Sequence, residues 1–118
     1  MPDWPQNIFL TPTEKAFLHI QAVLAATDIL PAPITPTWGH PQVLFRIQVI
    51  TTVAAIFSAQ IANGAFIQVA NFNSGVALVA NAAYIFDLLV HDPDTINFRL
   101  SVGGNITLRV QEILAGVS

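Results

Sequence analysis

The chain has 118 residues, a length typical of one domain, and 53% of them are hydrophobic, which excludes intrinsic disorder. Only 9% are charged, against roughly 25% in an average soluble protein. A folded monomer of this mass would expose about 6,200 Å² and carry about one charge per 570 Å². A surface with so few charged residues is poorly protected against association. We therefore expect companions to cover much of the surface; a monomer solvated by Asn, Gln, Ser and Thr is the alternative.

The formal net charge of −3 argues against nucleic-acid binding, which needs Lys and Arg to neutralise phosphates. The absence of cysteine excludes a disulfide framework, a zinc cluster and a thiol nucleophile. The first residues lack the basic and apolar regions of a secretory signal. Polar residues interrupt every apolar run before it reaches the length of a membrane span. We expect a protein assembled in the cytoplasm, without membrane or nucleic acid as a partner.

The first twelve residues contain three prolines among aromatic and aliphatic side chains. Prolines at this density prevent a helix and favour an extended segment. We expect residues 1–12 to form an N-terminal arm that docks on its own sheet or on a neighbouring subunit, and residues 13–118 to form one domain. The proline-rich stretch 27–42 is expected to be a crossover that caps the core, or a binding loop. The side chains expected to make arm and loop contacts are Trp4, Ile8, Phe9 and Trp38.

Residues 11–26 fit two structures. Thr11-Pro12-Thr13-Glu14 has the form of a helix capping box with proline at the first helical position. Against a helix, FLHIQAV at 17–23 is similar to FRIQVI at 45–50 and FIQVA at 66–70, which both have the character of strands. We predict a strand.

From residue 43 onward, apolar and polar residues alternate with period two, which is typical of antiparallel strands. Asn63-Gly64 predicts a type I′ hairpin turn, and the segments 73–75 and 92–94 predict further turns. The expected strands run over 43–49, 53–61, 65–71, 76–80, 84–90, 96–102 and 106–110.

Short strands with turns every 8–12 residues indicate an all-β fold. We expect an antiparallel β-sandwich or jelly roll of about eight short strands, with an extended proline-rich N-terminal arm. No charged residue occurs between Arg46 and Asp87, so both faces of the sheet there are expected to be covered. Glu112 would fall on an apolar face, so we expect a bulge or the end of a strand near it.

The densest cluster of titratable residues is His91-Asp92-Pro93-Asp94. Two carboxylates and an imidazole are potential calcium ligands, but a calcium loop needs more oxygen ligands and a glycine. We therefore expect an ordinary acidic turn and no metal. His19 and His40 have no metal-binding spacing around them. The candidate loop contacts to a ligand such as a glycan are His40, Asn73, His91, Asp92 and Asp94.

Three arginines, Arg46, Arg99 and Arg109, fall on the polar faces of predicted strands. If they lie beside Asp87 or Glu112 across strands, each ion pair adds about 0.2–1 kcal/mol. They could instead bridge subunits and set the register between them. The sequence contains no nucleophile elbow and no glycine-rich phosphate loop, and its carboxylates lie mostly in turns. We expect neither an enzyme nor a cofactor.

The segment 72–113, FNSGVALVANAAYIFDLLVHDPDTINFRLSVGGNITLRVQEI, resembles a class of small virion proteins of tailed phages and proviruses. Those proteins pair a Gly-x-Ala-Leu, Tyr-x-Phe-Asp hairpin with Asp-x-Ile-Asn-Phe-Arg and a closing Leu-Arg-Val-Gln-Glu strand. The resemblance covers about the last third of the chain. It implies a β-sandwich or jelly-roll module, often trimeric, on a capsid surface or in a minor head component, and it implies no catalytic residues. The matching residues are Gly75, Ala77, Leu78, Tyr84, Phe86, Asp87, Asp94, Ile96, Asn97, Phe98, Arg99, Leu108, Arg109, Val110, Gln111 and Glu112.

These observations lead to the hypothesis of a virion structural protein, either a capsid decoration (cement) protein or a minor capsid subunit. It would form a homo-oligomer, with a trimer favoured, and bind the major capsid protein or another shell protein. Two alternatives use the same fold. One is a carbohydrate-binding lectin or adhesin, and the other is a self-polymerising extracellular filament subunit completed by strand donation from residues 1–12.

Overall fold

The computed structural model describes residues 8–37 and 42–117. These residues form seven strands and one 3₁₀ turn, η1 (Asn73–Gly75), so the predicted all-β fold is confirmed. Among them, no helix has the length and apolar character needed to cross a bilayer. The strands are β1 (Ile8–Val23), β2 (Gln42–Thr51), β3 (Phe57–Asn63), β4 (Phe66–Asn71), β5 (Ala83–His91), β6 (Thr95–Leu100) and β7 (Gly104–Val117).

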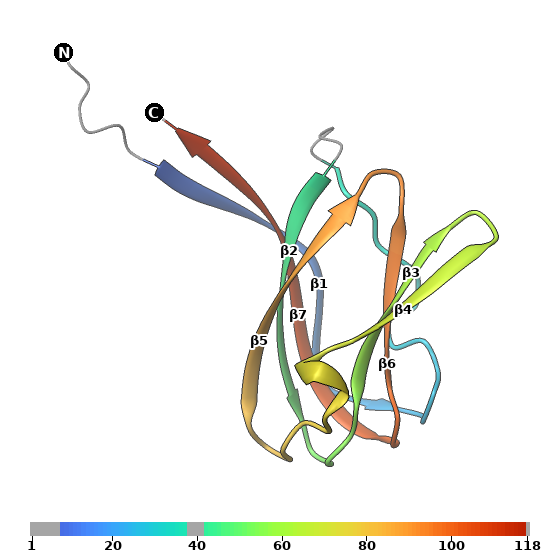
Figure 1. The fold of residues 1–118 in the computed structure, drawn as a ribbon. Coiled ribbons are helices and arrows are strands. Elements are labelled where there is room, and N and C mark those ends of the chain that lie inside the picture. Colours follow the sequence, from blue (N-terminus) through green and yellow to red (C-terminus); the bar gives the residue numbers. More distant parts are fainter. Residues whose placement is uncertain (1–7, 38–41, 118) are drawn as a thin grey trace.

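The strands form two antiparallel sheets packed face to face (Figure 1). The four-stranded sheet has the order β1-β7-β2-β5, and the three-stranded sheet has the order β4-β3-β6. Residues 24–37, between β1 and β2, run along the otherwise open edge of β6. Backbone amides of Ala26, Ile29 and Ile34 donate to carbonyls of β6 over 2.8–2.9 Å. This segment therefore acts as an irregular fourth member of the second sheet.

The order in which the chain visits the two sheets defines the connectivity. With residues 24–37 counted as a member of the second sheet, every connection crosses from one sheet to the other except the β3–β4 hairpin. The first and last strands, β1 and β7, lie side by side. Two such four-membered sheets, wound by a chain that alternates between them, make a jelly roll. The predicted sandwich of about eight strands is confirmed, with an irregular segment in place of one strand.

Alternate residues of the strands supply the core, as the period-two pattern predicted. Every second residue from Val43 to Val49 in β2 is buried, and so is every second residue from Ile96 to Leu100 in β6. A stack of phenylalanines fills the space between the sheets, and such aromatic pairs contribute about 0.5–1.5 kcal/mol beyond their burial. The ring centroids are separated by 4.9 Å for Phe86–Phe72, 5.0 Å for Phe72–Phe57 and 5.4 Å for Phe57–Phe98.

Strand β1 confirms the strand prediction for residues 11–26 as far as Val23. A helix is not formed because the apolar pattern repeats every second residue: Ala16 and Leu18 pack on the core, whereas Phe17 lies on the opposite face. The beginning of β1 and the end of β7 project from the sandwich as a two-stranded ribbon (Figure 1). In the part of the expected N-terminal arm that the structure describes, residues 8–12 pair with residues 113–117 of the same chain.

Two predicted strands differ from the structure. The strand expected over 53–61 begins only at Phe57, because residues 52–56 cross between the sheets. The strand expected over 76–80 is not formed; Leu78 makes a single bridge in which its amide donates to the carbonyl of Ala55 at 2.7 Å. Residues 76–80 instead belong to the connection from β4 to β5, which crosses from one sheet to the other.

The β3–β4 hairpin turn lies one residue later than predicted. Asn63 pairs with Phe66, so the two-residue loop is Gly64-Ala65. Gly64 has φ +62° and Ala65 is not among the residues with positive φ. A type I′ turn needs positive φ at both central positions, so the prediction of that turn type was wrong.

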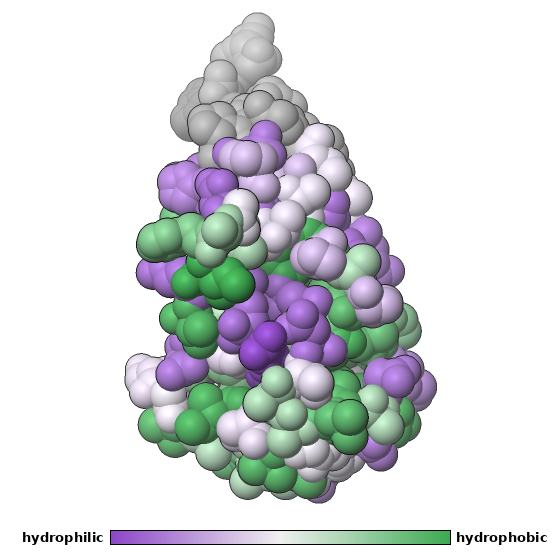
Figure 2. Space-filling view, turned by 90° about the vertical axis from the view of Figure 1, so that its right-hand side faces the viewer, coloured by the Kyte–Doolittle hydropathy of each residue, from purple (hydrophilic) through white to green (hydrophobic). Residues whose placement is uncertain are grey.

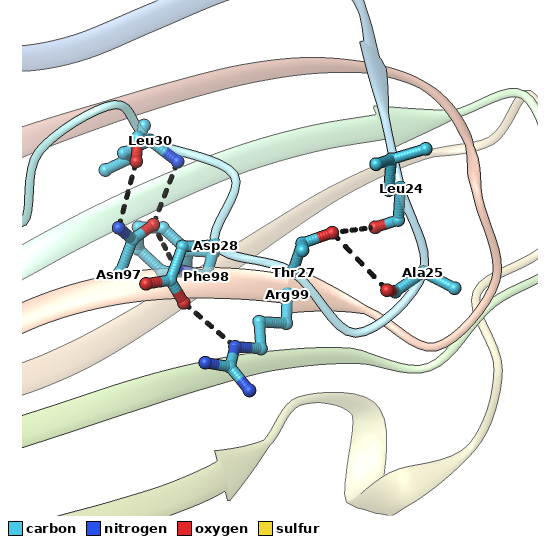
Figure 3. Close-up of polar contacts among 8 residues, drawn as sticks. All are labelled: Leu24, Ala25, Thr27, Asp28, Leu30, Asn97, Phe98 and Arg99. Atoms are coloured by element: carbon cyan, nitrogen blue, oxygen red, sulfur yellow. Dashed lines mark hydrogen bonds and ion pairs between the residues drawn. The ribbon is translucent and has the colours of Figure 1, made fainter.

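Asn97 anchors residues 24–37 against β6 (Figure 3). Its side chain is buried although it lies on the outer face of β6, because this segment covers it. Its Oδ1 accepts from the amides of Leu30 (2.9 Å) and Phe98 (2.8 Å), and its Nδ2 donates to the carbonyl of Leu30 (3.0 Å). The side-chain amide thus replaces two hydrogen bonds of a regular ladder. Beside it, Arg99 Nε lies 2.8 Å from a carboxylate oxygen of Asp28.

Candidate association surface

Among the side chains that the structure describes, large apolar ones are exposed in three regions. Contiguous exposed apolar surface marks interaction sites. The first region is the loop end, which we define as residues 24–27, 51–56, 72–82 and 101–103. The second is the β3–β4 hairpin, and the third is the outer face of the four-stranded sheet. Their exposed residues are Leu24, Val76, Val79 and Val102 at the loop end; Phe66, Ile67 and Val69 in the hairpin; and Phe17, Ile20, Ile50, Ile85 and Leu89 on the sheet.

The loop end is built from four connections that meet at one end of the jelly roll (Figure 1). Backbone hydrogen bonds join them: Asn81 N donates to Thr51 O at 2.6 Å, and Ser101 N donates to Ile56 O at 3.0 Å. None of the four connections contains an Asp, Glu, Lys, Arg or His residue. Leu24 is 75% exposed at its tip. These four connections are therefore uncharged and partly apolar.

The sequence alone reveals only half of this surface. Residues 51–56 and 72–82 belong to the uncharged stretch between Arg46 and Asp87 that the sequence makes conspicuous. Residues 24–27 and 101–103 lie outside that stretch, and the jelly-roll connectivity brings them beside it. The sequence does not show that these four segments lie close together, because their proximity depends on how the strands cross between the sheets.

The β3–β4 hairpin extends from the second sheet with apolar residues on both of its faces. Phe66 is 73% exposed on one face, and Ile67 and Val69 are exposed on the other. Figure 2, which views the molecule from this side, shows apolar patches around a central polar cluster and a lower end that is mostly apolar or neutral. The hairpin is therefore a second apolar contact region, separate in sequence from most of the loop end.

The outer face of the four-stranded sheet combines apolar and paired charged residues. A shallow groove of about 330 Å³ is bordered by Phe17 and Ile85. The guanidinium carbon of Arg109 lies 4.9 Å from the centre of the Phe17 ring, a cation–π contact, while Arg109 Nε lies 2.9 Å from a carboxylate oxygen of Glu14. The charge on this face is thus neutralised locally.

The three arginines expected to form ion pairs all have carboxylate partners within the chain. Arg46 and Asp87 form a two-pronged pair across β2 and β5, with distances of 2.9 and 3.2 Å. The hydrogen bond from Arg46 lowers the pKa of Asp87, and the same bond raises the pKa of Arg46. Arg99 and Arg109 pair instead with Asp28 and Glu14, which the sequence pattern did not identify as partners.

The bulge expected near Glu112 is present, but it lies in the neighbouring strand β1 and not in β7 itself. Strand β7 neither ends nor bulges relative to β2 at this residue: Glu112 stays in register with Phe45 and its side chain is fully buried. The bulge occurs in β1, where Lys15 is the extra residue between two ladder pairs, and Lys15 Nζ lies 3.5 Å from Glu112 Oε1. Thr37 donates to the same carboxylate from its amide (3.1 and 3.0 Å) and its hydroxyl (2.9 Å). The buried carboxylate of Glu112 therefore has a cationic partner in β1 and hydrogen-bond donors in the segment before β2.

The described residues among those proposed to contact a ligand do not lie together in the fold. Asn73 lies in η1, toward the loop end, whereas the turn after β5 lies at the opposite end (Figure 1). In that turn Asp94 Oδ1 accepts from Asn63 Nδ2 at 2.9 Å, and His91 Nε2 lies 3.4 Å from Gln42 Nε2. Asp92 is exposed. These contacts tie the turn to its neighbours. Across the described ranges, no three His, Cys, Asp or Glu residues are grouped as a metal would require.

Several of the predicted contact residues lie outside the part of the chain that the structure describes. Trp4, Trp38 and His40 lie outside the described residues, as do the side chains of Ile8 and Phe9, whose backbones belong to β1. Comparison with protein-family models, with curated proteins and with solved structures finds no match for this chain.

Proposed function

We propose that this protein is a structural subunit of a virion, acting as a capsid decoration (cement) protein or a minor capsid subunit. The observation that carries the proposal is the uncharged loop end, which leaves one pole of a charge-poor jelly roll without protection against association. The jelly roll is an architecture shared by viral capsid and lectin domains. The resemblance of residues 72–113 to small phage virion proteins favours the first of these.

Self-association would bury the loop end. Three copies that meet around one axis would cover Leu24, Val79 and Val102 of each copy with the same residues of the others, in a closed cyclic arrangement. Apolar burial contributes about 25 cal/mol per Å² before the costs of association. Because these four connections contain no charged side chain, their burial carries no penalty for charge desolvation.

The shell protein would be bound through a different surface. The β3–β4 hairpin extends from the sandwich and exposes Phe66, Ile67 and Val69. Aromatic and aliphatic side chains on a projecting element are suited to inserting between neighbouring shell subunits, where a few buried residues carry most of the binding free energy.

The proposal is tested by co-expressing the chain with the shell proteins encoded beside it and separating assembled particles by sedimentation. We expect the chain to sediment with the shells, and Phe66→Asp to leave it in the supernatant although the purified variant is still folded. Gln21→Asp, which places the same charge at an exposed position of β1 outside the hairpin and the loop end, should still sediment with shells, provided that it is folded. Absence of the wild-type chain from the particles would overturn the virion role.

A further inference from the structure

Strand β5 has the least protected edge of the two sheets. Each sheet edge presents backbone N–H and C=O groups that another strand can pair with, and proteins block such edges with bulges, prolines, lysines or covering segments. Residues 24–37 cover the edge of β6, and β1 carries Pro12 and two interruptions of its register. Strand β4 is only six residues long. These features protect the other three edges to different degrees.

Within the described residues, strand β5 has none of these devices. It pairs with β2 over nine consecutive residues, Ala83 to His91, without a register shift, and it contains neither proline nor lysine. Its outer side shows Ile85 and Leu89, which are 65% and 58% exposed. A regular and largely apolar edge strand of this kind is a template for a further strand.

The side chains of β5 complement β5 itself in one antiparallel register. Pairing centred on Asp87 would place two carboxylates opposite each other, which is unfavourable. Pairing centred on Leu89 places Leu89 against Leu89 of a second copy and each Asp87 opposite His91 of that copy, where an imidazole N–H can donate to the carboxylate. Antiparallel pairing of identical strands has two-fold symmetry and closes on itself.

We propose that β5 pairs with β5 of a second copy, antiparallel and centred on Leu89, and so joins two four-stranded sheets into one continuous eight-stranded sheet. This inference rests on the proposed self-association and names a second contact within it. The contact is independent of the loop end, because β5 lies along the side of the sandwich (Figure 1). If the loop ends form trimers, pairing through β5 doubles the number of copies.

The first test is the mass of the Leu89→Lys variant, measured by light scattering after size exclusion at micromolar concentration. Two lysines would face each other at the centre of the pair, so we expect the mass of the assembly to be halved while the circular dichroism spectrum is unchanged. The matched control is Ile67→Lys, which adds the same charge at a similarly exposed position on β4 and should leave the mass unchanged.

The second test uses the absence of cysteine from the chain. Directly opposed residues of an antiparallel pair have Cβ atoms about 4.5–5.5 Å apart, so Leu89→Cys should cross-link two copies under oxidation or with a short bismaleimide. Ile85→Cys should not. Cross-linking through Ile85→Cys instead, an unchanged mass for Leu89→Lys, or a halved mass for Ile67→Lys would each overturn the β5 contact alone. A wild-type chain that stays monomeric would overturn self-association as well.

Discussion

The Arg46–Asp87 pair is a contact between two residues that the alternation pattern of the strands helps to predict. Both residues fall on the outer face by the alternation of their strands, and antiparallel pairing then places them opposite each other. The two other arginines find carboxylates in β1 and in the segment after it. Those partners could not be predicted, since they depend on the neighbours of β7 and β6 in the finished fold.

Removal of the Arg46 guanidinium should raise the pKa of Asp87. The hydrogen bond from Arg46 lowers that pKa in the folded protein. The stability that Asp87 contributes is therefore fully present above its unfolded pKa of about 3.9 and is lost as the pH falls through the lower folded value. NMR titration of the carboxyl group in Arg46→Gln should show a higher pKa than in the wild type. Arg99→Gln, the control, should leave it unchanged; equal shifts in both variants would contradict the assignment.

The buried pair of Lys15 and Glu112 should behave as a unit. Removing one partner of a buried ion pair leaves an uncompensated charge and typically costs about 3–5 kcal/mol. We expect Glu112→Gln to lower the free energy of unfolding by roughly this amount, and the double variant Lys15→Met/Glu112→Gln to recover much of the loss. Chemical denaturation of the two single variants and the double variant measures the coupling. Strictly additive effects would show that the two residues do not interact.

Glu112 also shows why a residue can be misjudged from its own strand. Its place on the inner face was correctly anticipated, and the expected remedy was a bulge or an end in β7. The bulge lies instead in the neighbouring strand β1, where the extra residue Lys15 approaches the Glu112 carboxylate. Thr37 donates hydrogen bonds to the same carboxylate. The compensating residues lie far from Glu112 in the sequence, so no local pattern contains them.

At the scale of elements, local alternation predicted most strands because one face of each is buried. It failed for residues 76–80, a run of five apolar residues that crosses between the sheets and makes only the bridge between Leu78 and Ala55. It also could not show that residues 24–37, most of which belong to the stretch 27–42 read as a proline-rich crossover, complete the second sheet. Strand formation depends on a partner, and the partner is set by topology.

The covering segment should depend on Asn97. Asn97→Leu keeps a similar volume but leaves the amide and carbonyl of Leu30 without their hydrogen-bond partners. Each buried unsatisfied group costs about 1–3 kcal/mol, so we expect the loss of both partners to lower the free energy of unfolding by about 2–6 kcal/mol. Thr95→Val, on the same face of β6, should change it by less than about 0.5 kcal/mol.

Hydrogen exchange localises the effect of Asn97→Leu. Amides of residues 29–34 should exchange faster in the variant, whereas amides in the centre of β2 should keep the protection that global stability gives them. A variant as stable as the wild type, with unchanged exchange along this segment, would show that Asn97 does not hold it to β6.

At the scale of the whole molecule, composition and connectivity together define the proposed function. The scarcity of charge was visible in the sequence and led to the expectation of covered surface. The fold gives that scarcity a location, since the four connections of the loop end contain no charged residue, whereas the described charged residues lie on the strands, in the segment that follows Thr27 and in the turn after β5.

Charges placed on the loop end should disrupt assembly. The double variant Val79→Asp/Val102→Asp puts two carboxylates per copy into the proposed three-fold contact, where their desolvation is unfavourable. Both residues are exposed, so the fold should be retained. We expect the assembly mass to fall to that of a pair joined through β5. Gln68→Asp, at an exposed polar position of β4, is the control; an unaltered mass in the double variant would place the contact elsewhere.

The ribbon made by β1 and β7 has a practical consequence. Ile8 lies opposite Val117 at its tip, on the far side of the molecule from the loop end. Polypeptides genetically attached beyond these two residues would leave the subunit from one point and radiate outward from a trimer. If complementary halves of a split fluorescent reporter were fused to β1 and β7, the pairing of these strands would hold the halves close together. Fluorescence would then report a correctly folded subunit.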